Sequence, residues 1–159
     1  MGNLVVFYSR KGTTKNIGEM IINQENWDFE EIIDTKKRKG IIGFLKSGKD
    51  ATLKKLAKIK EVQKDPELFD LVIMGTPIWN KRMTPAIRTY ITEQKTKIKK
   101  VAFFCTEGGK GGIKAFESMA QLCDKIPIST LEITKQDIKD GVHVDKVSEF
   151  IEEIKSSNN

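Results

Sequence analysis

The stretch Asp70-Leu71-Val72-Ile73-Met74-Gly75-Thr76-Pro77-Ile78-Trp79 decides the fold class of this chain. It contains most of the strongest apolar run in the sequence, which predicts a strand from Leu68 to Met74. Strands that are apolar at consecutive positions are buried on both faces, as in a parallel sheet covered by helices. A loop that carries a tryptophan follows this strand directly, so the same stretch also points to a site at the strand's carboxyl end.

The rest of the chain repeats the alternation of strand and helix. Four further apolar runs predict strands over 4–8, 29–33, 101–105 and 128–133. Apolar residues at helical spacing predict five helices, marked by Ile17, Met20 and Ile21; Leu53, Leu56 and Ala57; Ile87, Tyr90 and Ile91; Ile113, Phe116, Ala120 and Cys123; and Val147, Phe150, Ile151 and Ile154. This pattern predicts an α/β fold, a doubly wound five-stranded parallel sheet with helices on both faces. The 159 residues fit one domain over 1–159, with residues 156–159 expected to fray.

The charge of the chain is concentrated in one segment. The net charge is +6, yet residues 36–64 hold eleven Lys or Arg and only two Asp or Glu. Lys36, Lys37, Arg38 and Lys39 follow the second predicted strand. We interpret them as a docking surface for an acidic redox partner, or alternatively as a solvated loop whose apolar residues cover a helix.

The cysteines and the N-terminal apolar run bear on the location of the protein. Cys105 and Cys123 form no metal-ligand spacing and no disulfide framework, which favours a reducing, cytoplasmic setting. Residues 4–8 are too few to cross a membrane, so we expect no membrane association from them.

Three loops follow the first, third and fourth predicted strands, and a parallel sheet binds its ligands at this edge. The first loop opens a helix, where backbone N–H groups favour phosphate; the alternative is a plain turn capped by Thr13. Its candidate binding residues are Ser9, Arg10, Lys11, Gly12, Thr13 and Thr14.

The second and third loops predict a flat ligand near the phosphate. Trp79 in a surface loop needs a flat or apolar partner, such as a flavin ring, unless it only covers the edge of the core. Four glycines among residues 108–112 allow the backbone to approach a ligand closely, or simply make a flexible turn. The candidate binding residues are Thr76, Pro77, Ile78, Trp79 and Asn80 in the second loop, and Thr106, Glu107, Gly108 and Gly109 in the third.

These loops resemble those of the flavodoxin family. Ser9-x-Lys11-Gly12-x-Thr14 is similar to the family's phosphate loop, Ser/Thr-x-Ser/Thr-Gly-x-Thr, with Lys11 in place of a hydroxyl. The stretch from Asp70 to Trp79 resembles the family's strand and flavin-flanking loop. The resemblance implies the strand order 2-1-3-4-5, a short-chain member, and bound FMN. It further implies that Thr76 to Asn80 lie against the flavin, that Trp79 stacks on one face of the ring, and that Thr106 to Gly109 approach the ring's other edge.

The resemblance implies a flavodoxin-like electron-transfer protein in which FMN carries the redox chemistry. We assign no catalytic side chain and no metal ligand. Lys81, Arg82 and Lys110 stand in the ring loops, and we expect their positive charge to raise the flavin's potential. One alternative is an FMN-dependent NAD(P)H:quinone or flavin reductase. A second is nucleic-acid binding through the basic segment, which the scarcity of aromatic residues there disfavours.

Overall fold

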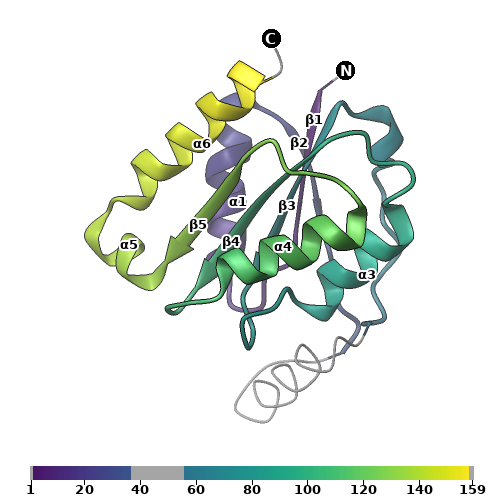
Figure 1. Ribbon diagram of the computed structural model, residues 1–159, viewed down its shortest axis with the longest axis horizontal. Helices are drawn as coiled ribbons and strands as arrows, with labels where there is room; N and C mark the ends of the chain where they lie inside the picture. Colours follow the sequence, from purple (N-terminus) through teal and green to yellow (C-terminus); the bar gives the residue numbers. More distant parts are fainter. Residues whose placement is uncertain (1, 37–55, 158–159) are drawn as a thin grey trace.

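The protein is a five-stranded parallel sheet between two layers of helices (Figure 1). The computed structural model describes residues 2–36 and 56–157. In chain order its elements are β1 (Asn3–Phe7), α1 (Thr13–Glu25), β2 (Asp28–Glu31), η1 (Pro66–Leu68), β3 (Leu71–Pro77), α3 (Pro85–Gln94), β4 (Val101–Glu107), α4 (Gly112–Cys123), β5 (Thr130–Thr134), α5 (Lys135–Asp140) and α6 (His143–Ser157).

The strand order is β2-β1-β3-β4-β5, and all four neighbouring pairs are parallel. The fold class and the strand order expected from the sequence are therefore confirmed. β3 lies at the centre of the sheet, which explains why its sequence is the most continuously apolar. The strand order reverses beside β1 and β3, so their carboxyl ends flank the crevice where such folds bind ligands.

Two apolar cores lie on the two faces of the sheet. On one face, alternate residues of the central strands, such as Val6, Met74 and Phe103, pack against α3 and α4. On the other face, residues such as Phe7 and Ile73 pack against α1 and α6. Figure 1 shows the same division of the helices. Each strand thus presents apolar side chains in both directions, as the consecutive apolar runs predict.

The central strand begins later and extends further than predicted. Asp65 caps the 3-10 helix η1, and its side chain accepts a hydrogen bond from the Glu67 N–H. The strand therefore begins at Leu71, while Leu68, predicted to be its first residue, is 65% exposed. At its other end, β3 runs through Gly75, where a Cβ would collide with the Phe104 ring of the neighbouring strand.

The helix predicted around Leu53, Leu56 and Ala57 is wrong where the structure describes it. Leu56 and Ala57 are not helical. The backbone N–H of Ala57 donates to the Thr89 Oγ1, and this hydroxyl donates in turn to the Ala57 carbonyl, both at 2.9 Å. Leu53 lies outside the described residues. The segment is held by a side chain of α3 rather than by its own helical bonds.

One predicted helix face and one predicted helix end differ from the structure. Ile113 was expected on the apolar face of α4, but it is 71% exposed, and Ala115 and Met119 are buried instead. The expected fraying from residue 156 does not begin there, because α6 continues to Ser157. The hydroxyls of Ser156 and Ser157 donate to the Glu153 carbonyl and so support the last turn.

The short helix α5 is missing from the sequence-based prediction. Its start carries a capping box, in which the Thr134 hydroxyl accepts from the Asp137 N–H and the Asp137 carboxylate accepts from the Thr134 N–H. The spacing of these two residues is a sequence signal for a helix start that could have revealed it. Within residues 2–36 and 56–157, none of the helices combines the length and the apolar character needed to cross a membrane.

Candidate functional site

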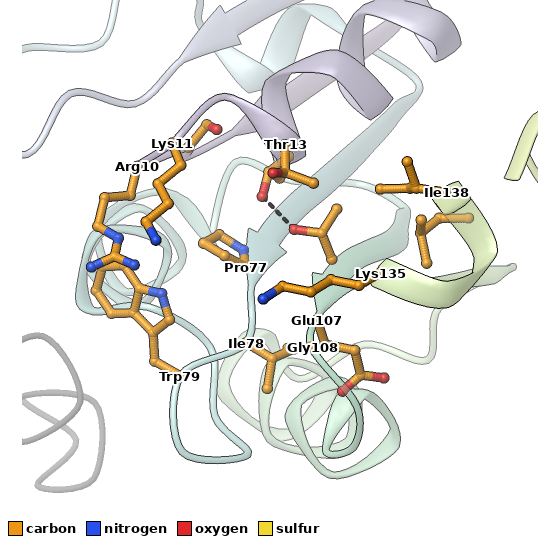
Figure 2. Close-up of a pocket in the computed structure, with 14 residues that line it drawn as sticks. Arg10, Lys11, Thr13, Pro77, Ile78, Trp79, Glu107, Gly108, Lys135 and Ile138 are labelled. Atoms are coloured by element: carbon orange, nitrogen blue, oxygen red, sulfur yellow. Dashed lines mark hydrogen bonds between the residues drawn. The ribbon is translucent and has the colours of Figure 1, made fainter. Parts of the chain in front are cut away.

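A cavity of about 340 Å³ opens at the carboxyl edge of the sheet (Figure 2). Its volume lies within the range of small-molecule sites. The loops after β1, β3 and β4 form its walls together with the start of α5. It is lined by Ser9, Arg10, Lys11, Thr13, Thr14, Pro77, Ile78, Trp79, Thr106, Glu107, Gly108, Ile133, Lys135 and Ile138.

The first wall is the start of α1. Gly12 is its N-cap residue and has a φ of 99°, a left-handed conformation that glycine adopts without strain. The Gly12 N–H donates to the Ser9 Oγ at 3.0 Å. Among the described residues no side chain caps the helix, so the N–H groups of its first turn remain for water or an anion. Thr13, the residue expected to cap a plain turn, is already inside the helix.

A hydrogen bond across the sheet joins this wall to β4. The hydroxyls of Thr14 and Thr106 lie 2.7 Å apart, and both residues are buried. Figure 2 draws this bond as a dashed line. It fixes the helix start against the strand that carries the third loop.

The second wall is a tight turn that carries Trp79. Trp79 and Arg82 exchange two backbone hydrogen bonds of 3.0 Å, and Asn80 and Lys81 between them have φ values of 49° and 60°. Two consecutive positive φ values are typical of a type I′ turn. Gly111 packs against this turn, since a Cβ on Gly111 would lie 2.6 Å from the Lys81 Cα. The second and third loops therefore support each other.

Trp79 lies at the edge of the cavity and is only 8% exposed. The Tyr8 ring meets it edge-on, with the ring centroids 5.7 Å apart. The Arg10 guanidinium carbon lies 5.6 Å from the indole centroid and covers one face, as Figure 2 shows. Stacking of a flavin on Trp79 stays a prediction, and it would require the ligand to share or replace the Arg10 contact.

Eleven of the fifteen predicted binding residues line this cavity, and four do not. Gly12 acts through its backbone at the helix start. Thr76 turns inward, where its hydroxyl accepts from the Thr84 N–H and joins the end of β3 to the start of α3. Asn80 forms the turn, and Gly109 lines a second cavity of about 420 Å³ beside the first.

The cations of the site differ from those expected. Lys81 and Lys110 line the second cavity, and Arg82 lines neither of the two. Arg10, Lys11 and Lys135 line the first. Sequence reasoning missed Lys135 and Ile138 because it missed α5, and it did not place Ile133, at the end of the fifth strand, in the site. Figure 2 shows the Lys135 side chain extending from the start of α5 across the cavity.

Glu107 closes the third wall. It is 6% exposed, and its Oε2 accepts from the Gly112 N–H at 3.2 Å, at the start of α4. Burial, and next to it the neighbouring Glu132 carboxyl, together raise the pKa of Glu107 to about 7. Burial likewise raises the pKa of the Cys105 thiol far above its usual range, so this cysteine is an inert packing residue.

Known structures share this fold. A flavoprotein from Lactobacillus acidophilus NCFM in complex with FMN is 21% identical and superposes with a TM-score of 0.71, over 92% of this chain and 98% of that one. A flavodoxin from the domain Archaea is 16% identical, with a TM-score of 0.55 over 98% and 99% of the two chains. The general stress protein 14 of Treponema denticola, in complex with FMN, is 14% identical, with a TM-score of 0.58 over 98% and 99%.

No protein-family model matches the chain, and no curated protein matches it. At these identities the structural likeness concerns the fold. Strand order, helix layers and the position of the cavity agree with it, and this chain has the flavodoxin-like fold.

Proposed function

We propose that the protein binds one FMN in the cavity of Figure 2 and passes electrons through it. The observation that carries this proposal is a single cavity that joins an uncapped helix start to an aromatic side chain. FMN has the matching halves, a phosphate and a flat ring. Its presence in two neighbours of the same fold supports the same choice.

The phosphate end of the cavity fits an anion. Gly12 lets the backbone turn into α1, and the first-turn N–H groups of the helix carry partial positive charge. Lys11 and the hydroxyl of Thr13 line the cavity beside them. These groups would hold the phosphate by hydrogen bonds from the backbone and from side chains.

The opposite end fits a flat, largely apolar ring. Pro77 and Ile78 line the cavity from the end of β3 and the loop that carries Trp79, and Ile138 lines it from α5 on the other side (Figure 2). Such a mixture of apolar walls with a few polar groups is typical of cofactor sites. Bound FMN would supply the redox chemistry, while these residues bind, orient and shield it from water.

The positively charged residues of the cavity would shift the redox potential of bound FMN in one direction. Reduction adds negative charge to the ring, and Arg10, Lys11 and Lys135 line the same space. Positive charge stabilises the reduced form, so these residues would raise the potential. This replaces the role that the sequence suggested for Lys81, Arg82 and Lys110.

The proposal is tested by titrating the protein with FMN and following the fluorescence of Trp79. The chain has two tryptophans, and Trp27 packs against the core on the far side of the sheet from Trp79. In the Trp27→Phe variant, Trp79 is the only source of tryptophan fluorescence, so any quenching by FMN is quenching of Trp79. We expect saturable quenching at micromolar FMN, and no quenching by riboflavin at the same concentration if the phosphate end binds. Unchanged fluorescence throughout the titration would refute the proposed cofactor.

A second measurement separates an electron carrier from a reductase. We propose a carrier, and therefore expect the FMN-loaded protein to oxidise NAD(P)H no faster than free FMN does. Rapid oxidation of NAD(P)H, followed by reduction of a quinone, would instead establish the reductase alternative.

We further propose that an acidic redox partner docks near Lys36. Lys37, Arg38 and Lys39 lie outside the described residues, whereas the Lys36 N–H donates to Asp34 at the carboxyl end of the β2 region, on the same edge as the cavity. Electron-transfer rates to an acidic partner should fall as salt rises, and a rate that does not depend on salt would contradict docking by charge.

We also propose a cytoplasmic location, which is supported by the two free cysteines.

A further inference from the structure

Two carboxyl groups meet under the start of α4. In the sheet register, Cys105 of β4 is paired with Glu132 of β5. Glu107 lies two residues further along β4 and therefore points to the same face of the sheet. One ligand atom from each of these three residues lies within 4.8 Å of the others. The two carboxyls thus come from different strands and meet only through the sheet.

The space around the pair is closed on the side of α4. A Cβ on Gly112 would lie 2.9 Å from the Cys105 Sγ and would collide with the Glu132 carboxylate. Glu107 Oε2 accepts from the Gly112 N–H, while its Oε1 is buried and has no hydrogen-bond partner among residues 2–36 and 56–157. An unpartnered oxygen beside a second carboxylate is costly unless a proton lies between them.

The pair also connects the two cavities. Glu107 lines the first cavity, where we place FMN, and Glu132 lines the second. In Figure 2 the Glu107 carboxylate turns from the first cavity toward α4. Glu132 therefore gives the pair a route to solvent, and Glu107 places it beside the ligand.

The charges that face the pair come from every neighbouring element. Lys146 of α6 donates to the Glu132 carbonyl and to the Asp137 carboxylate of α5. Lys81 of the Trp79 turn lines the second cavity with Glu132. Three more charged residues line it, Lys110 of the third loop and Lys114 and Glu117 of α4. Lys135 lines the first cavity with Glu107. These cations and the N-terminus of α4 favour one negative charge on the pair, while burial opposes two.

We propose that Glu107 and Glu132 hold one proton between them at neutral pH, and that this pair is a redox-linked proton site of the cavity. When an electron donor adds negative charge to the ligand, the anionic form of the pair is disfavoured. A proton then enters from water through Glu132, so the added negative charge is partly balanced within the protein. The identity of the ligand rests on the proposed function, whereas the sharing of a proton does not.

The raised pKa of Glu107 agrees with this assignment, because its causes are burial and the Glu132 carboxyl. A divalent cation is the competing occupant. Burial raises the pKa of the Cys105 thiol, so a thiolate ligand for a metal forms less readily. The start of α4 already supplies positive charge beside the carboxyls. The site therefore stabilises a bound divalent cation less than it stabilises a proton.

The first test uses the protein without FMN and a ¹³C label on the glutamate side chains. We expect one carboxyl signal to titrate near pH 7 and to move to lower pH in Glu132→Gln. Glu93→Gln, which removes an exposed charge from α3 and lies in neither cavity, should leave that signal unchanged. If Glu132→Gln does not fold, Glu107→Gln tests the same pair through Glu132. Titration of every glutamate below pH 5 would overturn the shared proton, and so would a cobalt-thiolate absorption band on adding Co²⁺.

The second test measures the midpoint potential of the FMN-loaded protein between pH 6 and 8. The potential of the wild-type protein should fall more steeply with pH than that of Glu107→Gln, and Glu93→Gln should follow the wild type. Equal slopes in all three proteins would overturn the redox link, even if the first test succeeds. Failure of FMN to bind would reject the proposed function and the link, while the first test alone still decides whether the proton is shared.

Discussion

Lys135 shows how one side chain changes the electrostatics of the cavity. It is the first residue of α5, and its stem runs close to the third loop, with its Cε 3.9 Å from the position of a Cβ on Gly108. Figure 2 shows its ammonium group over the middle of the cavity. A cation in this place would attract the anionic ligand and stabilise its reduced form.

We expect Lys135→Gln to weaken FMN binding about fivefold to tenfold, which corresponds to a loss of roughly 1–1.4 kcal/mol. The midpoint potential should fall as well, because positive charge near the ring is lost. Fluorescence titration and potentiometry measure the two effects. Lys139→Gln, which changes an exposed lysine of the same helix that does not line the cavity, is the matched control. Equal affinities for both variants would exclude Lys135 from the site.

At the scale of the elements, the site depends on loops that support one another. Gly111 has a φ of 124° and packs against the Lys81 backbone, so the glycine-rich loop holds the turn that carries Trp79. Gly109 in the same loop has no atom of the described residues within 4 Å of its Cβ position. The two glycines therefore have different structural roles despite their closeness in sequence.

Gly111→Ala should destabilise the protein by about 2 kcal/mol, because the new methyl group overlaps the turn and the φ is strained. It should also weaken FMN binding, since Trp79 must move with the turn. Gly109→Ala should leave the free energy of unfolding and the affinity nearly unchanged. Urea denaturation and FMN titration of both variants provide the measurement, and a well-tolerated Gly111→Ala would contradict the packing described.

The capping box of α5 gives a second prediction at this scale. Thr134→Ala removes the hydroxyl that accepts from the Asp137 N–H, and loss of such a cap costs about 1 kcal/mol. Because α5 has only six residues, we expect its amides to exchange faster with deuterium, while those of α6 stay protected. Thr134→Ser keeps the hydroxyl and should restore the protection. Equal exchange in all three proteins would mean that the cap does not hold the helix.

At the scale of the whole molecule, the buried acid pair affects stability across pH. The pKa of Glu107 is raised from an ordinary value of 4.5 to about 7 in the folded protein. Between these values the folded state binds more protons than the unfolded state, so stability decreases as pH rises through this window. The direction is opposite to that of a salt-bridged carboxylate.

We therefore expect the free energy of unfolding of the wild-type protein to decline from pH 5 to pH 7.5 more than that of Glu107→Gln. The amide carries no charge at any pH in this range, so its buried state has no such dependence. Urea denaturation at several pH values measures the difference, with Glu93→Gln as the control for loss of an exposed charge. Parallel pH profiles for wild type and Glu107→Gln would show that Glu107 is ionised normally in the fold.

The sequence by itself determined the class of the fold and the place of the site. Consecutive apolar residues mark strands that are buried on both faces, whatever lies against them, so the run before Trp79 sufficed for the central strand. A helix start after the first strand likewise predicts an anion site, because its N–H groups depend on local backbone alone. Eleven of the predicted binding residues meet in one cavity for this reason.

Tertiary structure decided which side chains meet. The partners of Thr76 and Ala57 lie at the N-cap of α3 and within it, 8 and 32 residues away in sequence, which no local pattern shows. The pairing of Glu107 with Glu132 depends on the register of β4 and β5, and the covering of Trp79 by Arg10 depends on the approach of two loops. Local periodicity reports burial, but contacts between distant segments are set by how the strands and helices pack, and only the folded chain specifies that packing.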